Sequence, residues 1–98
     1  MIKLFRMASG EEVICEVLEE TDDTVTISNP IVAIPGDGNK IGFVSWAPFL
    51  DKESTDKLEV QKRFIVFSGS VNDDIHDYYT NTFSPIIKPS ANSKKLVL

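Results

Sequence analysis

Cysteine, histidine and long apolar runs are all scarce in this chain. The single cysteine, Cys15, excludes an internal disulfide and fits a reducing compartment. No apolar run reaches the roughly eighteen residues that a membrane-spanning helix requires. Glu11 and Glu12 fall where a signal peptide has its apolar segment. We therefore expect a cytoplasmic protein that contacts no membrane.

Residues suited to catalysis or metal binding are equally sparse. His76 is the only histidine, and no second imidazole or nearby thiol gives it the spacing of a metal site. The acidic pair at 22–23 is typical of a turn, and the acidic pair at 73–74 is typical of the first turn of a helix. No set of nucleophile, base and oxyanion donor emerges. The sequence predicts a binding protein rather than an enzyme, with no catalytic residue, metal, cofactor or small-molecule substrate.

The charge balance is acidic, with fifteen acidic and ten basic residues among 98 and a formal net charge of −5. Wrapping a nucleic-acid duplex needs Lys and Arg in quantity, so this balance argues against that role. It is compatible with a short single strand held at one local site. A single domain of this length buries only about two-thirds of its unfolded surface, and oligomerisation is one way to bury more.

The chain does contain a succession of short β-type segments. We expect five strands, over about residues 2–8, 13–18, 24–34, 40–46 and 60–67, joined by short turns without a helical crossover. Val25 and Ile27 are predicted to point into the core, whereas Ile14 lies on a partly solvated face. Pro30 is expected to bend its strand without ending it. This pattern predicts an antiparallel sheet curled into a small barrel.

The periodicity changes after residue 71. Asn72 is a good N-cap, and apolar residues follow it at three- and four-residue spacing, which predicts a short amphipathic helix over 73–83. Pro85 ends it. We predict one domain over residues 1–86, with the barrel at about 2–71, and a flexible tail over 87–98.

Three aromatic residues, Phe43, Trp46 and Phe49, lie in or beside the fourth expected strand. Aromatic side chains on a sheet can stack nucleic-acid bases, but such surfaces usually carry interleaved basic residues. Only Lys40 lies nearby. We therefore expect these aromatic residues to fill a core or a subunit interface.

Two stretches resemble the signatures of the Sm-like family, which includes the LSm and Hfq-type proteins. The first, over residues 4–30, has a glycine at Gly10, apolar strand residues on both sides of a turn, and the pair Asp22-Asp23. The second, over residues 65–71, is similar to an apolar strand that ends in a small loop built on glycine. The likeness covers about residues 2–71. Residues 9–14 and the Pro48 segment are more specifically similar to compact Sm-like proteins of putative cyanophage origin, in which the helix follows the barrel.

The resemblance implies a mainly β fold: a small, five-stranded, strongly bent antiparallel barrel of the SH3-like type with a short C-terminal helix. It also implies a homo-oligomeric ring of about five to seven subunits, formed by pairing edge strands of neighbouring copies. Two loops of each subunit would face the pore and hold single-stranded RNA. The RNA-binding residues implied are Asp22, Asp23, Thr24, Ser68, Gly69 and Ser70, with Lys62 and Arg63 as further basic candidates.

The chain departs from the family pattern at the RNA site. Val25 and Thr26 stand where the family has asparagine, Glu19-Glu20 replaces a stacking aromatic, and Ser68 replaces a basic residue. Two functions therefore stay open. An RNA-regulatory protein requires a basic rim on one face, formed by Lys62, Arg63, Lys88, Lys94 and Lys95. The acidic charge and the altered pocket favour the other function, an oligomeric protein-binding scaffold or adaptor in the phage cycle.

Overall fold

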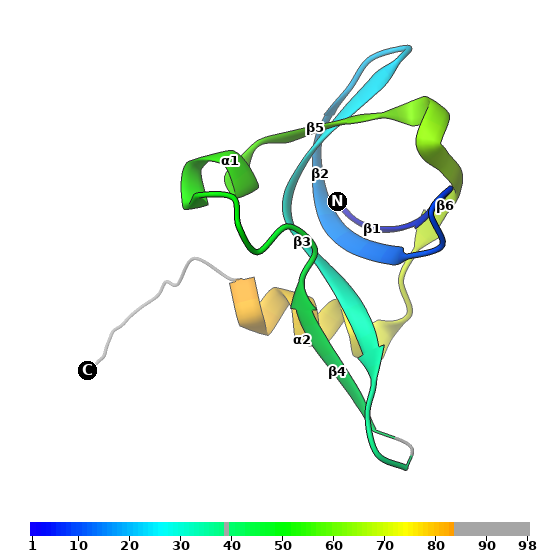
Figure 1. Cartoon of the computed structure of the whole chain (residues 1–98), viewed down its shortest axis with the longest axis vertical. Coiled ribbons are helices and arrows are strands. Elements are labelled where there is room, and N and C mark those ends of the chain that lie inside the picture. The colour runs from blue at the N-terminus through cyan, green and yellow to red at the C-terminus, as the bar shows by residue number, and fades with distance from the viewer. Residues whose placement is uncertain (39, 84–98) are drawn as a thin grey trace.

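A single antiparallel β-sheet forms the body of the protein, with a helix against one face (Figure 1). The computed structural model describes residues 1–38 and 40–83, so residues 84–86 of the predicted domain and the predicted tail over 87–98 lie outside the described residues. The mainly β class with a short C-terminal helix is confirmed. The elements in chain order are β1 (Ile2–Met7), β2 (Glu12–Glu20), β3 (Thr24–Pro35), β4 (Ile41–Ser45), α1 (Lys52–Asp56), β5 (Leu58–Gln61), the 3-10 helix η1 (Lys62–Phe64), β6 (Ile65–Ser70) and α2 (Asp73–Phe83).

The strands are ordered β4-β3-β2-β1-β6, and β5 pairs with β3 beside this path. The long strand β3 uses the same edge twice, because its first residues pair with β5 and its last residues with β4. Figure 1 shows β2, β1, β6 and β5 following one another around a ring. Strands β5 and β6 are consecutive in the chain and are linked by η1. In the described part of the chain they are not paired with each other by backbone hydrogen bonds. The sheet is therefore open at this point.

The described sheet has six strands rather than the five expected, because the strand predicted over 60–67 is two strands separated by η1. At this break the backbone bonds to two different loops. The amide of Lys62 donates to the carbonyl oxygen of Asp23 (2.8 Å), and the carbonyl oxygen of Phe64 accepts from the amide of Ala8 (2.7 Å). No single straight partner strand could satisfy both groups, so the local backbone turns.

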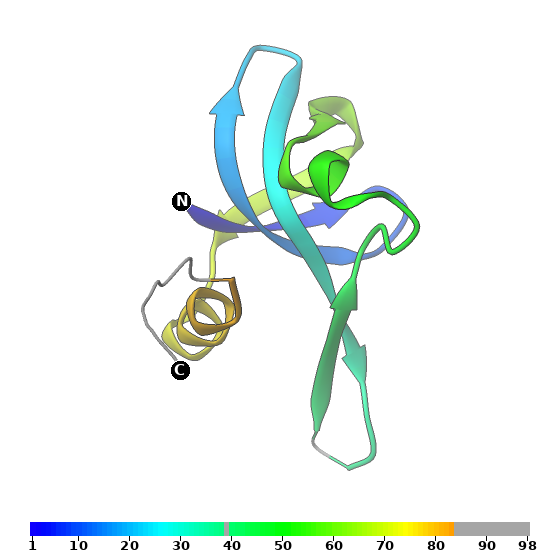
Figure 2. The same cartoon turned by 90° about the vertical axis from the view of Figure 1, so that its left-hand side faces the viewer.

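Apolar side chains are buried on both faces of the sheet. On the inner face, Val25 and Ile27 are almost completely buried with residues of β1, β2 and β5, as the alternating pattern predicts. On the other face, α2 covers Ile14 and Ile31, as Figure 2 shows from the side. On this face of β2 Ile14 is only 3% exposed beneath the helix, whereas Leu18 is 45% exposed, so the face is partly solvated as predicted.

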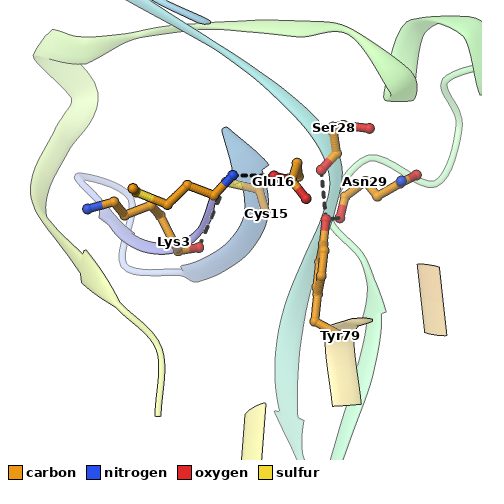
Figure 3. Close-up of polar contacts among 7 residues, drawn as sticks. Lys3, Cys15, Glu16, Ser28, Asn29 and Tyr79 are labelled. Carbon is orange, nitrogen blue, oxygen red and sulfur yellow. Dashed lines mark hydrogen bonds and ion pairs between the residues drawn. The ribbon is translucent and has the colours of Figure 1, made fainter. Parts of the chain in front are cut away.

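Strand β3 bends at Asn29-Pro30 without ending, as predicted. Asn29 has φ of 50°, a left-handed conformation that asparagine tolerates better than most residues, and the pairing with β2 shifts register here. The hydroxyl of Tyr79 on α2 shares its proton between the carbonyl oxygens of Ser28 (2.8 Å) and Asn29 (2.9 Å), as Figure 3 shows. Burial is the main cause of the raised pKa of this tyrosine. One buried side chain thus fixes both the bend and the position of the helix.

The C-terminal helix α2 begins where the sequence predicts and continues to Phe83, the last residue that the structure describes. The side-chain oxygen of Asn72 accepts a hydrogen bond from the amide of Ile75 (2.9 Å), which is the expected N-cap contact. Asp73 and Asp74 lie in the first turn, where carboxylates are stabilised by the helix dipole. The charged segment before β5 contains the short helix α1, with Asp51 as its N-cap.

Candidate functional site: the β2–β3 turn and η1

The turn between β2 and β3 presents two carboxylates to solvent. The hydroxyl oxygen of Thr21 accepts hydrogen bonds from the amides of Asp23 (3.3 Å) and Thr24 (3.0 Å). The amide of Thr21 in turn donates to the carbonyl oxygen of Thr24 (2.9 Å). These hydrogen bonds give the backbone groups of the turn partners within the turn itself, and the Asp22 and Asp23 side chains lie exposed at its tip.

The basic residues of η1 lie against this turn. The ammonium of Lys62 forms an ion pair with Glu20 (2.8 Å), while the Lys62 backbone bonds to Asp23. The pKa of the Glu20 carboxyl is lowered below its usual value. The hydrogen bond from Lys62 is the main cause, and the positive charge of Lys62 adds to it. We call the hollow formed here the turn–η1 pocket. It has a volume of about 290 Å³ and is lined by Asp22, Asp23, Gln61, Lys62 and Arg63.

The other three candidate residues are not in a loop. Ser68, Gly69 and Ser70 belong to β6, where they pair with Phe5, Leu4 and Lys3 of β1. The prediction of a glycine loop at this place was wrong, because β1 offers a partner along its whole length and the ladder continues to Ser70. The turn–η1 pocket therefore brings Asp22 and Asp23 together with Lys62 and Arg63, and does not include the Ser68–Ser70 segment.

Phe64, at the end of η1, contacts Arg63 but lies outside the lining of the turn–η1 pocket. Its side chain is 48% exposed, and the guanidinium carbon of Arg63 lies 4.9 Å from the centre of its ring. The signal in the sequence was an aromatic residue directly after two basic ones. Such an arrangement offers a π-face and a cation side by side, which are the two groups that bind unstacked bases without sequence preference.

The aromatic residues near β4 have different environments. Phe43 packs beneath α2, stacked on Tyr78 with ring centres 4.7 Å apart. Trp46 packs against the inner core and its indole N–H donates to a carboxylate oxygen of Glu11 (3.3 Å). Both serve packing, as expected. Phe49 is fully exposed, so the prediction of a core role does not hold for this residue within one subunit.

Within residues 1–38 and 40–83, no three His, Cys, Asp or Glu side chains are grouped so that they could hold a metal ion. His76 is exposed on α2, with its Nδ1 atom 3.7 Å from a carboxylate oxygen of Asp77. None of the described helices has the length and apolar character needed to cross a bilayer.

We expect Cys15 to be unreactive in the folded protein. Its side chain is completely buried, and burial, together with the negative charge of Glu16, raises the pKa of the thiol to about 12. Because the thiolate is the nucleophile, Ellman's reagent at pH 8 should label the native chain much more slowly than the chain in 8 M urea. Complete labelling of the native protein within seconds would show that the inner core opens readily.

Neither the models of known protein families nor the sequences of characterised proteins match this chain.

Proposed function

We propose that this chain is a ring-forming binding module of the Sm-like type, with single-stranded RNA as its ligand. The observation that carries the proposal is the pair of outer strands, β4 and β6, which end the strand order and both expose apolar side chains. In Figure 1 these strands lie on different sides of the molecule. One edge of a subunit is therefore free to meet the other edge of the next.

The two edges are suited to pairing. On β4, Ile41 is 63% and Val44 is 45% exposed, and on β6, Val66 is 65% and Phe67 is 51% exposed. An exposed, apolar edge strand is a template for adding another strand, since its outer N–H and C=O groups have no partner in the sheet. Head-to-tail pairing of β4 with β6 of the next copy, repeated until the ring closes, gives both ends of the β4-β3-β2-β1-β6 order a partner. A ring of about five to seven subunits satisfies this requirement.

The curvature of the sheet supports a strongly bent barrel of the Sm-like kind. The left-handed conformation of Asn29 bends β3, and β3 then pairs with β5 before the bend and with β4 after it. When a bent strand pairs with two different strands along the same edge, the sheet curls around its inner core. The inner core of Val25, Ile27 and Val60 lies on the concave side of this curl.

The turn–η1 pocket is the best candidate for the RNA site. Arg63 in the pocket and the exposed ring of Phe64 beside it supply a cation and a stacking surface, the two kinds of group that hold a single strand. Lys62 adds a second positive charge, although Glu20 neutralises it in the free protein. An arriving phosphate would compete with Glu20 for this ammonium, so affinity should depend steeply on salt.

The second candidate function is a ring that binds protein, as a scaffold or adaptor in the phage cycle. It is favoured by the carboxylates of Glu20, Asp22 and Asp23, which surround the two basic residues of the pocket. Across the chain acidic residues exceed basic ones by a net charge of −5. A ring with this charge repels phosphate at long range and attracts basic protein segments.

Native mass spectrometry of two edge variants tests the ring. We expect the wild-type chain to form a closed oligomer, and Val44→Asp and Val66→Asp each to abolish it, because each places a charge in the paired edge. The two variants keep opposite edges intact. When they are mixed, the intact β6 of the first should pair with the intact β4 of the second and give a heterodimer that neither forms alone.

The control is Thr80→Asp, a charge introduced at an exposed residue of α2 outside both edges, which should leave the oligomer unchanged. A monomeric wild-type chain would contradict the ring. A dimer that survives in one edge variant would instead indicate symmetric pairing of like edges, β4 with β4 or β6 with β6.

Fluorescence anisotropy with a labelled hexauridylate tests the RNA site. We expect binding at 50 mM salt that weakens strongly at 200 mM, and Arg63→Gln to weaken it about tenfold, because the variant removes both the charge and the contact with Phe64. Lys57→Gln removes an equal charge from an exposed residue outside the pocket, and should have a much smaller effect. Absence of binding at low salt would leave the protein-binding ring as the function.

A further inference from the structure

A second and larger pocket opens on the inner side of the sheet. It lies between β1, β2 and β6, and we call it the Lys3 pocket. Its volume of about 360 Å³ falls within the range of small-ligand sites. Its apolar lining comes from strands β1, β2, β3 and β6 and consists of Phe5, Val17, Val25, Ile65, Val66 and Phe67.

The polar lining of this pocket is nearly as extensive as the apolar lining, and it is unbalanced in charge. It consists of two lysines, Lys3 and Lys62, one carboxylate, Glu20, and the residue Ser68 of β6. Lys62 and Glu20 neutralise each other in an ion pair of 2.8 Å. Lys3 has no carboxylate within 4 Å in the described part of the chain. One positive charge is therefore left in the lining.

Lys3 lies on the inward face of β1, two residues before the buried Phe5, and its side chain is partly buried. Figure 3 shows this side chain extended away from Cys15 and Glu16. Removing an ammonium from water is unfavourable unless a partner compensates its charge. The position is unusual for a lysine that serves only as a solvated surface charge, since the alternation of the strand would favour an apolar residue there.

We infer that the Lys3 pocket binds a small carboxylate with an apolar body. The apolar body would cover the side chains of Phe5, Val17, Val25 and Ile65, and the carboxylate would accept a charge-assisted hydrogen bond from Lys3. The hydroxyl of Ser68 can donate a second hydrogen bond. A single negative charge on the ligand matches the single positive charge of the lining. The lining shares Val66 and Phe67 with the β6 edge of the proposed ring and Lys62 with the proposed RNA site, whereas Lys3, which would hold the carboxylate, belongs to neither.

Isothermal titration of the full chain with sodium decanoate, kept below its micellar concentration, tests the inference. We expect saturable binding with one site per subunit, and a parallel titration with 2-naphthoate shows whether an aromatic body is accepted as well. Lys3→Met keeps the length of the side chain and removes its charge, so affinity for either carboxylate should fall about tenfold. Lys40→Met, a matched change at the exposed turn before β4, should leave affinity unchanged.

Ser68→Leu provides a variant that fills the pocket. Ser68 is exposed at the pocket rim, so the larger side chain should occupy the ligand volume without displacing the core, and a thermal melt confirms that the variant folds. Binding should then be lost. The inference is overturned if neither carboxylate binds the wild-type chain, if Lys3→Met binds equally well, or if uncharged decanol binds as tightly as decanoate.

Discussion

Val25→Asp is expected to unfold the domain. Val25 is 2% exposed at the centre of the inner core, and its backbone pairs with Val60 on one side and Glu20 on the other. An aspartate there would place a carboxylate among the buried apolar side chains of the inner core, where it must lose its hydration or stay protonated, at a cost of several kcal/mol. Domains of this size have a total stability of about 5–15 kcal/mol, so little or none would remain. Loss of the cooperative transition in a circular-dichroism melt is the expected result.

Phe49→Asp is the control for this experiment, because it introduces the same charge at a fully exposed side chain. Its melting temperature should match that of the wild-type chain. If Val25→Asp also melted normally, Val25 would not lie in the core. The assignment of the inner face of β3 would then be wrong by one residue along the strand, since a shift of one residue exchanges the two faces.

Tyr79→Phe is expected to destabilise the domain by about 1–3 kcal/mol, the usual range when a buried polar group loses its partner. Tyr79 is 2% exposed, and the substitution keeps its ring while removing the proton shared by the carbonyl oxygens of Ser28 and Asn29. For a domain of about 100 residues, each kcal/mol lowers the melting temperature by roughly 4–8 °C. Thermal and urea unfolding of the variant provide the measurement.

The neighbouring residue provides a matched control. Tyr78 is 44% exposed, and its hydroxyl makes no hydrogen bond with another described residue. Tyr78→Phe should therefore change the free energy of unfolding by less than about 0.5 kcal/mol, as surface changes usually do. Equal effects of the two substitutions would mean that the hydrogen bonds of Tyr79 contribute nothing, and that the bend at Asn29 is held by the sheet alone.

The two experiments concern features that differ in how far sequence could predict them. The burial of Val25 and Ile27 follows from alternation with polar residues, because successive strand residues point to opposite faces. The N-cap at Asn72 and the start of α2 likewise follow from short-range chemistry. The contact of Tyr79 with the β3 bend joins residues about fifty positions apart, and no local pattern indicates it.

The same distinction applies to the candidate site. The composition of the turn predicts that Asp22 and Asp23 are exposed, since a threonine side chain satisfies the backbone from within. Their proximity to Lys62 and Arg63 depends on the backbone bond from Lys62 to Asp23, which forms only when β5 pairs with the start of β3. The expected glycine loop at Ser68–Ser70 failed for a similar reason, because strand pairing with β1 overrides the weak strand preference of serine and glycine.

The sequence by itself determined the β class of the described domain, the burial of Val25 and Ile27, the turn at Asp22-Asp23 and the start of the C-terminal helix, because each depends on periodicity or on contacts within a few residues. Only the tertiary structure decided how many strands the 58–70 segment forms, that Ile14 is buried beneath α2, and which basic residues meet the acidic turn. These depend on which strand edges meet after the sheet has bent. Pairing between distant segments depends on the geometry of the whole sheet, and a local pattern of residues does not determine that geometry.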